Sequence, residues 1–276
     1  MLKKGLMNNL NNRKSIVSTR FIFRVLKLLI FLLLYSPVSA QKNNFIDMRG
    51  GVERLAIRDK GMSPLMYTGL GFFGGVDWHR LGTNQTTQLG LNAAMGKQRN
   101  KYGYPVDYRK ASVQLSTFYH KNRSPEGKLL WGWTLNNLIS HRYNAGMVNF
   151  QDHYEYFTNI GPAVKYRYPI RIKERELNLE LLGYVQLLGF MIRPSYTSSY
   201  PTGFLQEEEK VVQGLWKSAE LFYPGNSWNF GFHPRLNYAL RSGNKISVGY
   251  RYEFYRLNSR VTHSGGAWFF SLITRI

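Results

Sequence analysis

A glycine-rich stretch supplies the first pattern in this chain that could bind a ligand. Gly69, Gly71 and Gly74 follow the G-x-G-x-x-G spacing of dinucleotide-binding loops, in which a helix opens at the end of the motif and its N–H groups meet the phosphates. The residues that follow keep the alternation of a strand, so no helix is predicted there. Glycine inside a strand more often permits a bend or close packing across strands. We therefore expect no nucleotide, and no cofactor of any other kind.

Two sets of polar neighbours could do hydrolytic or proton-transfer chemistry. His263 and Ser264 are adjacent, and adjacent strand residues point to opposite faces, so this base and this nucleophile cannot meet. Asp77 and His79 do share a face, but no second carboxylate pair stands opposite them in the predicted topology. No two of the six His residues lie two or four positions apart, and the chain has no Cys. Neither a catalytic site nor a metal site is predicted.

The elements that carry these residues are β-strands. Residues 245–255 alternate between two faces with a period of two, which no helix produces. One face holds Ile246, Val248, Tyr250, Tyr252 and Phe254, and the other holds Lys245, Ser247, Gly249, Arg251, Glu253 and Tyr255. Residues 227–240 repeat this pattern, and residues 241–244 read as the tight turn of a hairpin.

Extending this pattern along the chain predicts about ten strands. They run near residues 45–58, 65–80, 85–96, 106–120, 128–142, 154–172, 176–193, 227–240, 245–257 and 262–276. Short connections alternate with longer ones, and the longest spans residues 194–226. Pro162, Pro169 and Pro234 fall inside strands, where proline removes a ladder hydrogen bond, so those strands are expected to start late, end early or bulge.

The pattern from residue 41 to residue 276 resembles that of the bacterial outer-membrane β-barrels. The alternating faces, the large aromatic residues on the apolar face and the final strand with Trp268, Phe270 and Leu272 on one side carry the resemblance. It implies an all-β fold, a transmembrane antiparallel up-and-down barrel located in the bacterial cell outer membrane. It also implies outer-membrane lipid, lipopolysaccharide and the barrel-assembly machinery as partners. An aromatic content of 15% together with a mean hydropathy of -0.34 agrees with such a protein.

The first 40 residues predict a cleavable signal peptide. A basic segment is followed by an apolar run that is too short to cross a bilayer, and Val38-Ser39-Ala40 provides small residues for a peptidase. This segment holds seven Lys and Arg and no acidic residue, so about +14 of the formal charge of +21 belongs to residues 41–276. Because the basic residues are dispersed rather than clustered on one stripe, no nucleic-acid partner is expected. Residues 1–40 and 41–276 are thus a signal peptide and one barrel domain.

The face opposite the apolar one carries charges of both signs and is expected to line the barrel lumen. The predicted lumen charges are Lys165, Arg167, Arg171, Glu176, Glu180, Arg235, Arg251, Glu253 and Arg275. The arginines among them give this lumen a predicted basic bias. In the long connection, apolar residues are spaced like one face of a short helix, which suggests a lid over the barrel mouth. The candidate lid residues are Val212, Leu215, Trp216 and Phe222.

Two functions remain open from the sequence. The first is a narrow or gated pore, or an uptake accessory, for a small solute, because about ten strands enclose little more than side-chain volume. The second is a non-conducting surface or scaffold protein that binds an unknown protein through its extracellular loops. A lipid hydrolase or a protease of the outer membrane is less favoured, so the chain is not expected to be an enzyme.

Overall fold

The computed structural model describes eight segments of the chain. They are residues 44–60, 63–119, 129–146, 151–172, 175–193, 219–240, 242–258 and 260–276. The predicted signal peptide lies outside these segments, and so do three candidate lid residues, Val212, Leu215 and Trp216, together with the short helix expected there.

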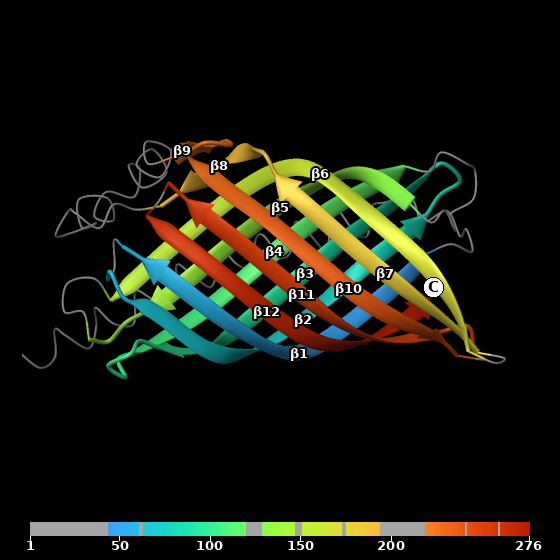
Figure 1. The fold of residues 1–276 in the computed structure, drawn as a ribbon, viewed down its shortest axis with the longest axis horizontal. Coiled ribbons are helices and arrows are strands. Elements are labelled where there is room, and N and C mark those ends of the chain that lie inside the picture. The colour runs from blue at the N-terminus through green and yellow to red at the C-terminus, as the bar shows by residue number, and fades with distance from the viewer. Residues whose placement is uncertain are drawn as a thin grey trace, which may run out of the picture. The chain divides into compact units, whose positions relative to one another are not determined.

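The described residues form one antiparallel sheet that closes on itself (Figure 1). Its strands are β1 (Asn44–Asp59), β2 (Met66–Leu81), β3 (Gln85–Arg99), β4 (Pro105–Tyr119), β5 (Leu129–Tyr143), β6 (Asp152–Ile172), β7 (Arg175–Gln186), β8 (Leu188–Ile192), β9 (Ala219–Phe222), β10 (Ser227–Ala239), β11 (Lys245–Leu257) and β12 (Val261–Arg275). Ten of them, β1–β7 and β10–β12, make the ring, because β1 pairs with β12 and β5 pairs with β6. β8 and β9 extend the wall at one end.

Closure is complete along the seam between the first and last strands. Val52 in β1 lies opposite Phe72 in β2 on one side and opposite Trp268 in β12 on the other. A membrane-spanning sheet must close in this way, since hydrocarbon offers no partner to the backbone groups of an open edge. No helix among the described residues is long and apolar enough to cross a membrane.

The strand between residues 175 and 192 is interrupted once. Leu187 lies outside the regular ladder, separating β7 from β8, and its backbone N–H donates to the carbonyl oxygen of Ile160 in β6 at 3.0 Å. This break sits opposite Pro162, as expected for a proline in a strand. The same expectation is wrong for Pro169, which lies opposite Asn178 in unbroken register. At Pro234 the register with β7 is continuous opposite Leu181, but the pairing with β11 skips His233 and Pro234, in keeping with the ladder hydrogen bond that proline removes.

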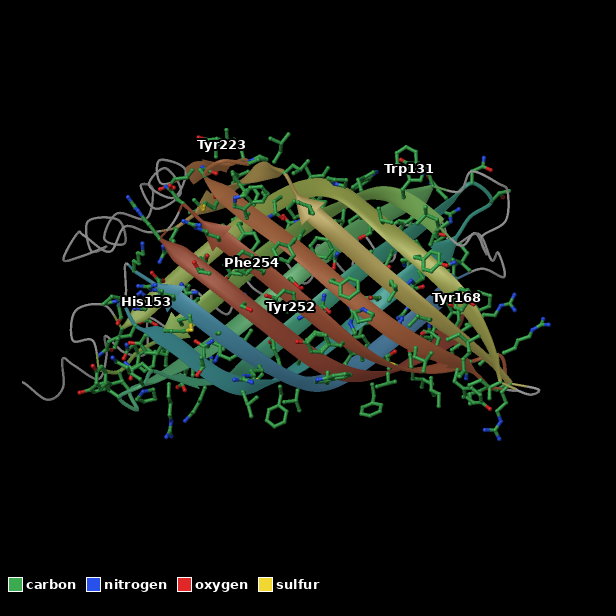
Figure 2. The ribbon with its side chains drawn as sticks, viewed as in Figure 1. Trp131, His153, Tyr168, Tyr223, Tyr252 and Phe254 are labelled. Carbon is green, nitrogen blue, oxygen red and sulfur yellow. The ribbon has the colours of Figure 1, made fainter. Side chains whose placement is uncertain are left out.

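The two faces of the sheet separate apolar from polar side chains as the alternation predicts. On β12, Trp268 and Phe270 are 66% and 75% exposed on the outer surface, whereas Phe269 between them is 4% exposed inside. Figure 2 shows aromatic side chains projecting from the outside of the wall, among them Trp131 and Tyr168 toward the end where the C-terminus lies. An apolar outer surface around a polar interior is the distribution found in transmembrane barrels.

The two ends of the barrel differ. We call the end with the short β2–β3, β6–β7 and β10–β11 connections and the C-terminus the turn end, and the opposite end, reached by the β7–β10 connection, the loop end. In outer-membrane barrels the short turns face the periplasm and the longer loops face outside. The predicted strand positions agree with the observed ones to within a few residues, except that the single strand predicted at residues 176–193 is divided in the structure into β7 and β8.

Candidate functional site

The barrel interior is the place where chemistry-bearing side chains gather, because every second residue of each strand points into it. Toward the turn end, Glu180 in β7 is the centre of an ion-pair network. Its Oε1 accepts from Nη2 of Arg235 at 2.7 Å, and its Oε2 accepts from Nε of Arg167 at 3.2 Å. Lys165 Nζ lies 3.7 Å from Glu180 Oε1. Arg235 also pairs with Asp47, so β10 is tied across the lumen to β1.

A second set of contacts surrounds Asp77 in β2. Its Oδ1 accepts from Nη2 of Arg49 at 2.6 Å, and its Oδ2 accepts from Nε2 of Gln88 at 2.9 Å. The amide oxygen of Gln88 is also engaged, because Oε1 accepts a hydrogen bond from Nζ of Lys165 at 3.1 Å. The three carboxylates Asp47, Asp77 and Glu180 therefore belong to one network of alternating charges toward the turn end.

Midway along the barrel, two glutamates meet two cations. Lys110 in β4 pairs with Glu53 in β1 and lies 3.7 Å from Glu253 in β11. Arg251 Nε lies 3.5 Å from Glu253 Oε1, and the Arg251 guanidinium stands over the Phe73 ring at 4.1 Å from its centroid. Burial of these four charges is tolerated because each faces an opposite charge.

At the loop end a third network lies around Asp59 and Glu155. Arg142 in β5 donates to Oδ2 of Asp59 at 2.9 Å and to Oε2 of Glu155 at 3.0 Å. Arg193 pairs with Asp59 as well. These groups are almost completely buried, and they couple strands β1, β5 and β6 and the end of β8.

Apolar clusters fill the space between these networks. The loop-end cluster consists of Ile57, Tyr67, Val106, Leu138, Phe157, Met191, Phe222, Tyr255, Leu257 and Val261. The middle cluster consists of Leu55, Phe73, Ala94, Tyr108, Ala267 and Phe269. The turn-end cluster consists of Phe118, Leu130, Ala163, Leu182 and Tyr184. The interior of the described barrel is thus packed with side chains from one end to the other.

Six of the predicted lumen charges lie in this interior: Lys165, Arg167, Glu180, Arg235, Arg251 and Glu253. Two others, Arg171 and Arg275, are exposed near the turn-end termini of their strands, and the side chain of Glu176 lies outside the described part of the chain. Of the candidate lid residues, Phe222 is described. It is fully buried in the loop-end cluster, where it is held by β9.

The predicted lumen charges included the acids Glu176, Glu180 and Glu253 but missed five further interior acids. These are Asp47, Glu53, Asp59, Asp77 and Glu155, all of which are almost completely buried. Their inward direction follows from the same alternation that identified the bases. Applying the inward and outward alternation of the last strands to β1, β2 and β6 would have identified these acids as inward-pointing. In the described interior these acids are paired with basic groups, whereas the sequence predicted a lumen with a basic bias.

Asp47, Asp77 and His79 come close enough for their ligand atoms to share one metal ion, all lying within 4.8 Å of one another. The surrounding charge argues for a different use. Arg235 already pairs with Asp47, and Arg49 pairs with Asp77, so two guanidinium groups neutralise the carboxylates that would bind a cation. This donor set fits arginine counter-charges better than a metal.

The remaining hydrolytic candidates are also separated by the fold. His263 points inward and stacks on Tyr255 with ring centroids 4.4 Å apart. Ser264 points outward, where its hydroxyl lies 3.1 Å from the Tyr252 hydroxyl. The glycine motif between residues 69 and 74 lies wholly inside β2. No helix follows it there, so no phosphate-binding helix end is formed.

The comparisons with known proteins give weak likenesses. No protein-family model matches the sequence, and no curated protein matches it. Among solved structures, the transport unit of the autotransporter AIDA-I from Escherichia coli is 9% identical, with 89% of this chain and 94% of that chain covered and a TM-score of 0.41. Neisserial surface protein A is also 9% identical, with 84% of this chain and 97% of that chain covered and a TM-score of 0.38.

The toluene transporter TbuX from Ralstonia pickettii is also 9% identical, with coverage of 86% and 90% and a TM-score of 0.38. Similarities this low assign neither a family nor a function. The chain's own closed sheet, its apolar outer surface and its charged, filled interior give it the fold of the bacterial outer-membrane β-barrels.

Proposed function

We propose that this protein is a non-conducting barrel of the outer membrane that acts as a surface or scaffold protein through its loop end. The observation that carries the proposal is the packing of the interior. Three apolar clusters and three ion-pair networks occupy the lumen together, and the loop-end cluster includes side chains from β1, β2, β4, β5, β6, β8, β9, β11 and β12. A small solute would have to displace this packing in order to pass.

Charge supports the same conclusion. A pore selective for anions needs cations that remain available to the solute. Here Arg235 and Arg251 are each engaged by carboxylates, and Lys165 is 1% exposed. Paired charges of this kind fix the strands relative to one another rather than attract a solute. The alternative of a narrow pore would require the loop-end cluster to open.

The loop end also carries a preorganised aromatic surface that suits partner binding. In the β3–β4 turn, the Asn100 side chain accepts hydrogen bonds from the backbone N–H groups of Tyr102 and Tyr104 at 2.9 and 3.1 Å. Gly103 between them has a φ of 85°, which a glycine adopts without strain. Tyr102 and Tyr104 are 65% and 59% exposed. Tyrosines held rigid in this way are effective contact residues, since little entropy is lost when they bind.

Planar-bilayer recording of the purified, refolded protein tests this proposal. We expect no steady current in chloride or phosphate solutions from the wild-type barrel. A variant in which the loop-end cluster is cut back, Phe157→Ala with Leu138→Ala, serves as the comparison, because removing these two side chains opens space in the lumen. A steady, anion-selective current from the wild-type protein would overturn the proposal in favour of the pore.

A further inference from the structure

The outer wall of β1–β4 carries an unusual concentration of positive charge near the loop end. Arg54 in β1, Lys97 and Arg99 in β3, and Arg109 in β4 all point outward and are exposed; we call these four residues the basic patch. Arg54, Arg99 and Arg109 form no ion pair within the part of the chain that the structure describes. Among the described residues, Lys97 has one acidic neighbour, Asp107, at 3.9 Å, and the two side chains are 73% and 49% exposed.

The register places these four groups close together. Leu70 in β2 lies opposite both Arg54 and Lys97, so these two cations stand two strand spacings apart, about 10 Å. Lys97 and Arg99 are two residues apart on the same face, about 7 Å. Arg109 lies opposite Met95, and so is a diagonal neighbour of Lys97 at about 7–8 Å. Side chains as long as Arg and Lys can therefore converge on a single multiply charged headgroup.

An apolar surface adjoins the patch along the same strands. Val52, Phe72 and Met95 lie side by side across β1, β2 and β3, and Phe72 is 75% exposed. Each is two residues from a patch member or from Leu70, so it lies on the same outer face. Cations that border exposed hydrocarbon-facing side chains match a lipid with an anionic headgroup, not a soluble anion.

The charge is distributed asymmetrically between the two ends of this wall. On the turn-end half of β1–β4, the outward strand positions carry one charged residue, Arg80. The loop-end half carries the whole basic patch together with Arg58, against the single acid Asp107. In an outer membrane the loop end faces the outer leaflet, where lipopolysaccharide presents several phosphates on one lipid.

We propose that the basic patch binds the phosphates of the lipid A portion of lipopolysaccharide, with its acyl chains against Val52, Phe72 and Met95. Arginine is suited to this ligand because its planar guanidinium can hold two phosphate oxygens at once. The site does not depend on whether the lumen conducts, so conductance results leave it unaffected.

The test uses the full barrel refolded in detergent and titrated with purified lipid A, with binding followed by native mass spectrometry. Each basic residue at an anionic lipid surface contributes about fivefold in affinity, so the variant Arg54→Gln/Lys97→Gln/Arg99→Gln/Arg109→Gln is expected to bind at least about tenfold more weakly. The matched control is Arg80→Gln, which removes the same charge from the same wall at the turn end. It is expected to bind like the wild type.

Dephosphorylated lipid A forms the second arm, and its binding to the wild type should be weakened by about the same factor. Equal binding of both lipids, or an unchanged affinity in the fourfold variant, overturns the proposal. Equal competition by phosphatidylglycerol overturns it too, since the patch would then attract any anionic lipid. Folding of each variant is checked by the migration of unheated samples on gels. Arg54→Gln/Arg109→Gln replaces the fourfold variant if that one does not fold, with the same predicted direction.

Discussion

At the residue scale, the interior charges depend on one another. Arg142 is 2% exposed and holds both Asp59 and Glu155, so Arg142→Met leaves two carboxylates buried beside fewer cations. Breaking a buried pair in this way costs about 3–5 kcal/mol. We expect the urea midpoint of the refolded barrel to fall accordingly.

The control for this prediction is Arg80→Met, which removes an exposed arginine and should change the free energy of unfolding by no more than about 0.5 kcal/mol. Adding Glu155→Gln to Arg142→Met should recover most of the loss, because Asp59 keeps its pairing with Arg193 and the other carboxylate charge that Arg142 had balanced is then gone. If Arg142→Met unfolds at the wild-type urea concentration, the loop-end network does not stabilise the barrel.

At the scale of the strands, closure depends on close approach of the backbones at particular glycines. A Cβ at Gly51 in β1 would collide with the carbonyl oxygen of Trp268 in β12, across the seam that closes the ring. At the neighbouring Gly50, the nearest atom to a Cβ would be the Phe73 carbonyl oxygen at 3.9 Å, an ordinary contact. We expect Gly51→Ala to destabilise the barrel by about 1–3 kcal/mol, since the strands must move apart.

Refolding yields into detergent measure this difference. The folded fraction, read from unheated gel samples, should drop for Gly51→Ala and stay unchanged for Gly50→Ala. Equal yields for the two variants would contradict the assignment of Gly51 as the point of close contact between the first and last strands.

At the scale of the whole molecule, the outer surface is expected to contact lipid along its length. Trp268 is 66% exposed on the outside, whereas Phe269 is buried inside. In a background whose other tryptophans are replaced by Phe, Trp268 fluorescence should be strongly quenched by brominated lipid chains. A tryptophan moved one position, by Trp268→Phe with Phe269→Trp, should be quenched far less, because that side chain points into the barrel. Similar quenching at both positions is incompatible with a lipid-facing outer wall.

The local pattern of the sequence determined the fold class, the strand positions and the direction of most side chains. The alternation of residues 245–255 was sufficient to assign Tyr250 and Tyr252 to the outer face and Arg251 and Glu253 to the interior, as the structure has them. This works because the period of a strand is local, and because lipid and a polar interior impose opposite demands on alternate residues.

The tertiary structure decided which interior groups meet and how full the lumen is. Arg235 pairs with Asp47, which is 188 residues away along the chain, and Arg142 pairs with Asp59 at a separation of 83 residues. Such partners are set by the order and stagger of strands around a closed ring, and no local period encodes them. For the same reason the sequence predicted an excess of basic charge in the lumen. In the closed barrel, basic groups are paired with acidic groups from strands far away along the chain.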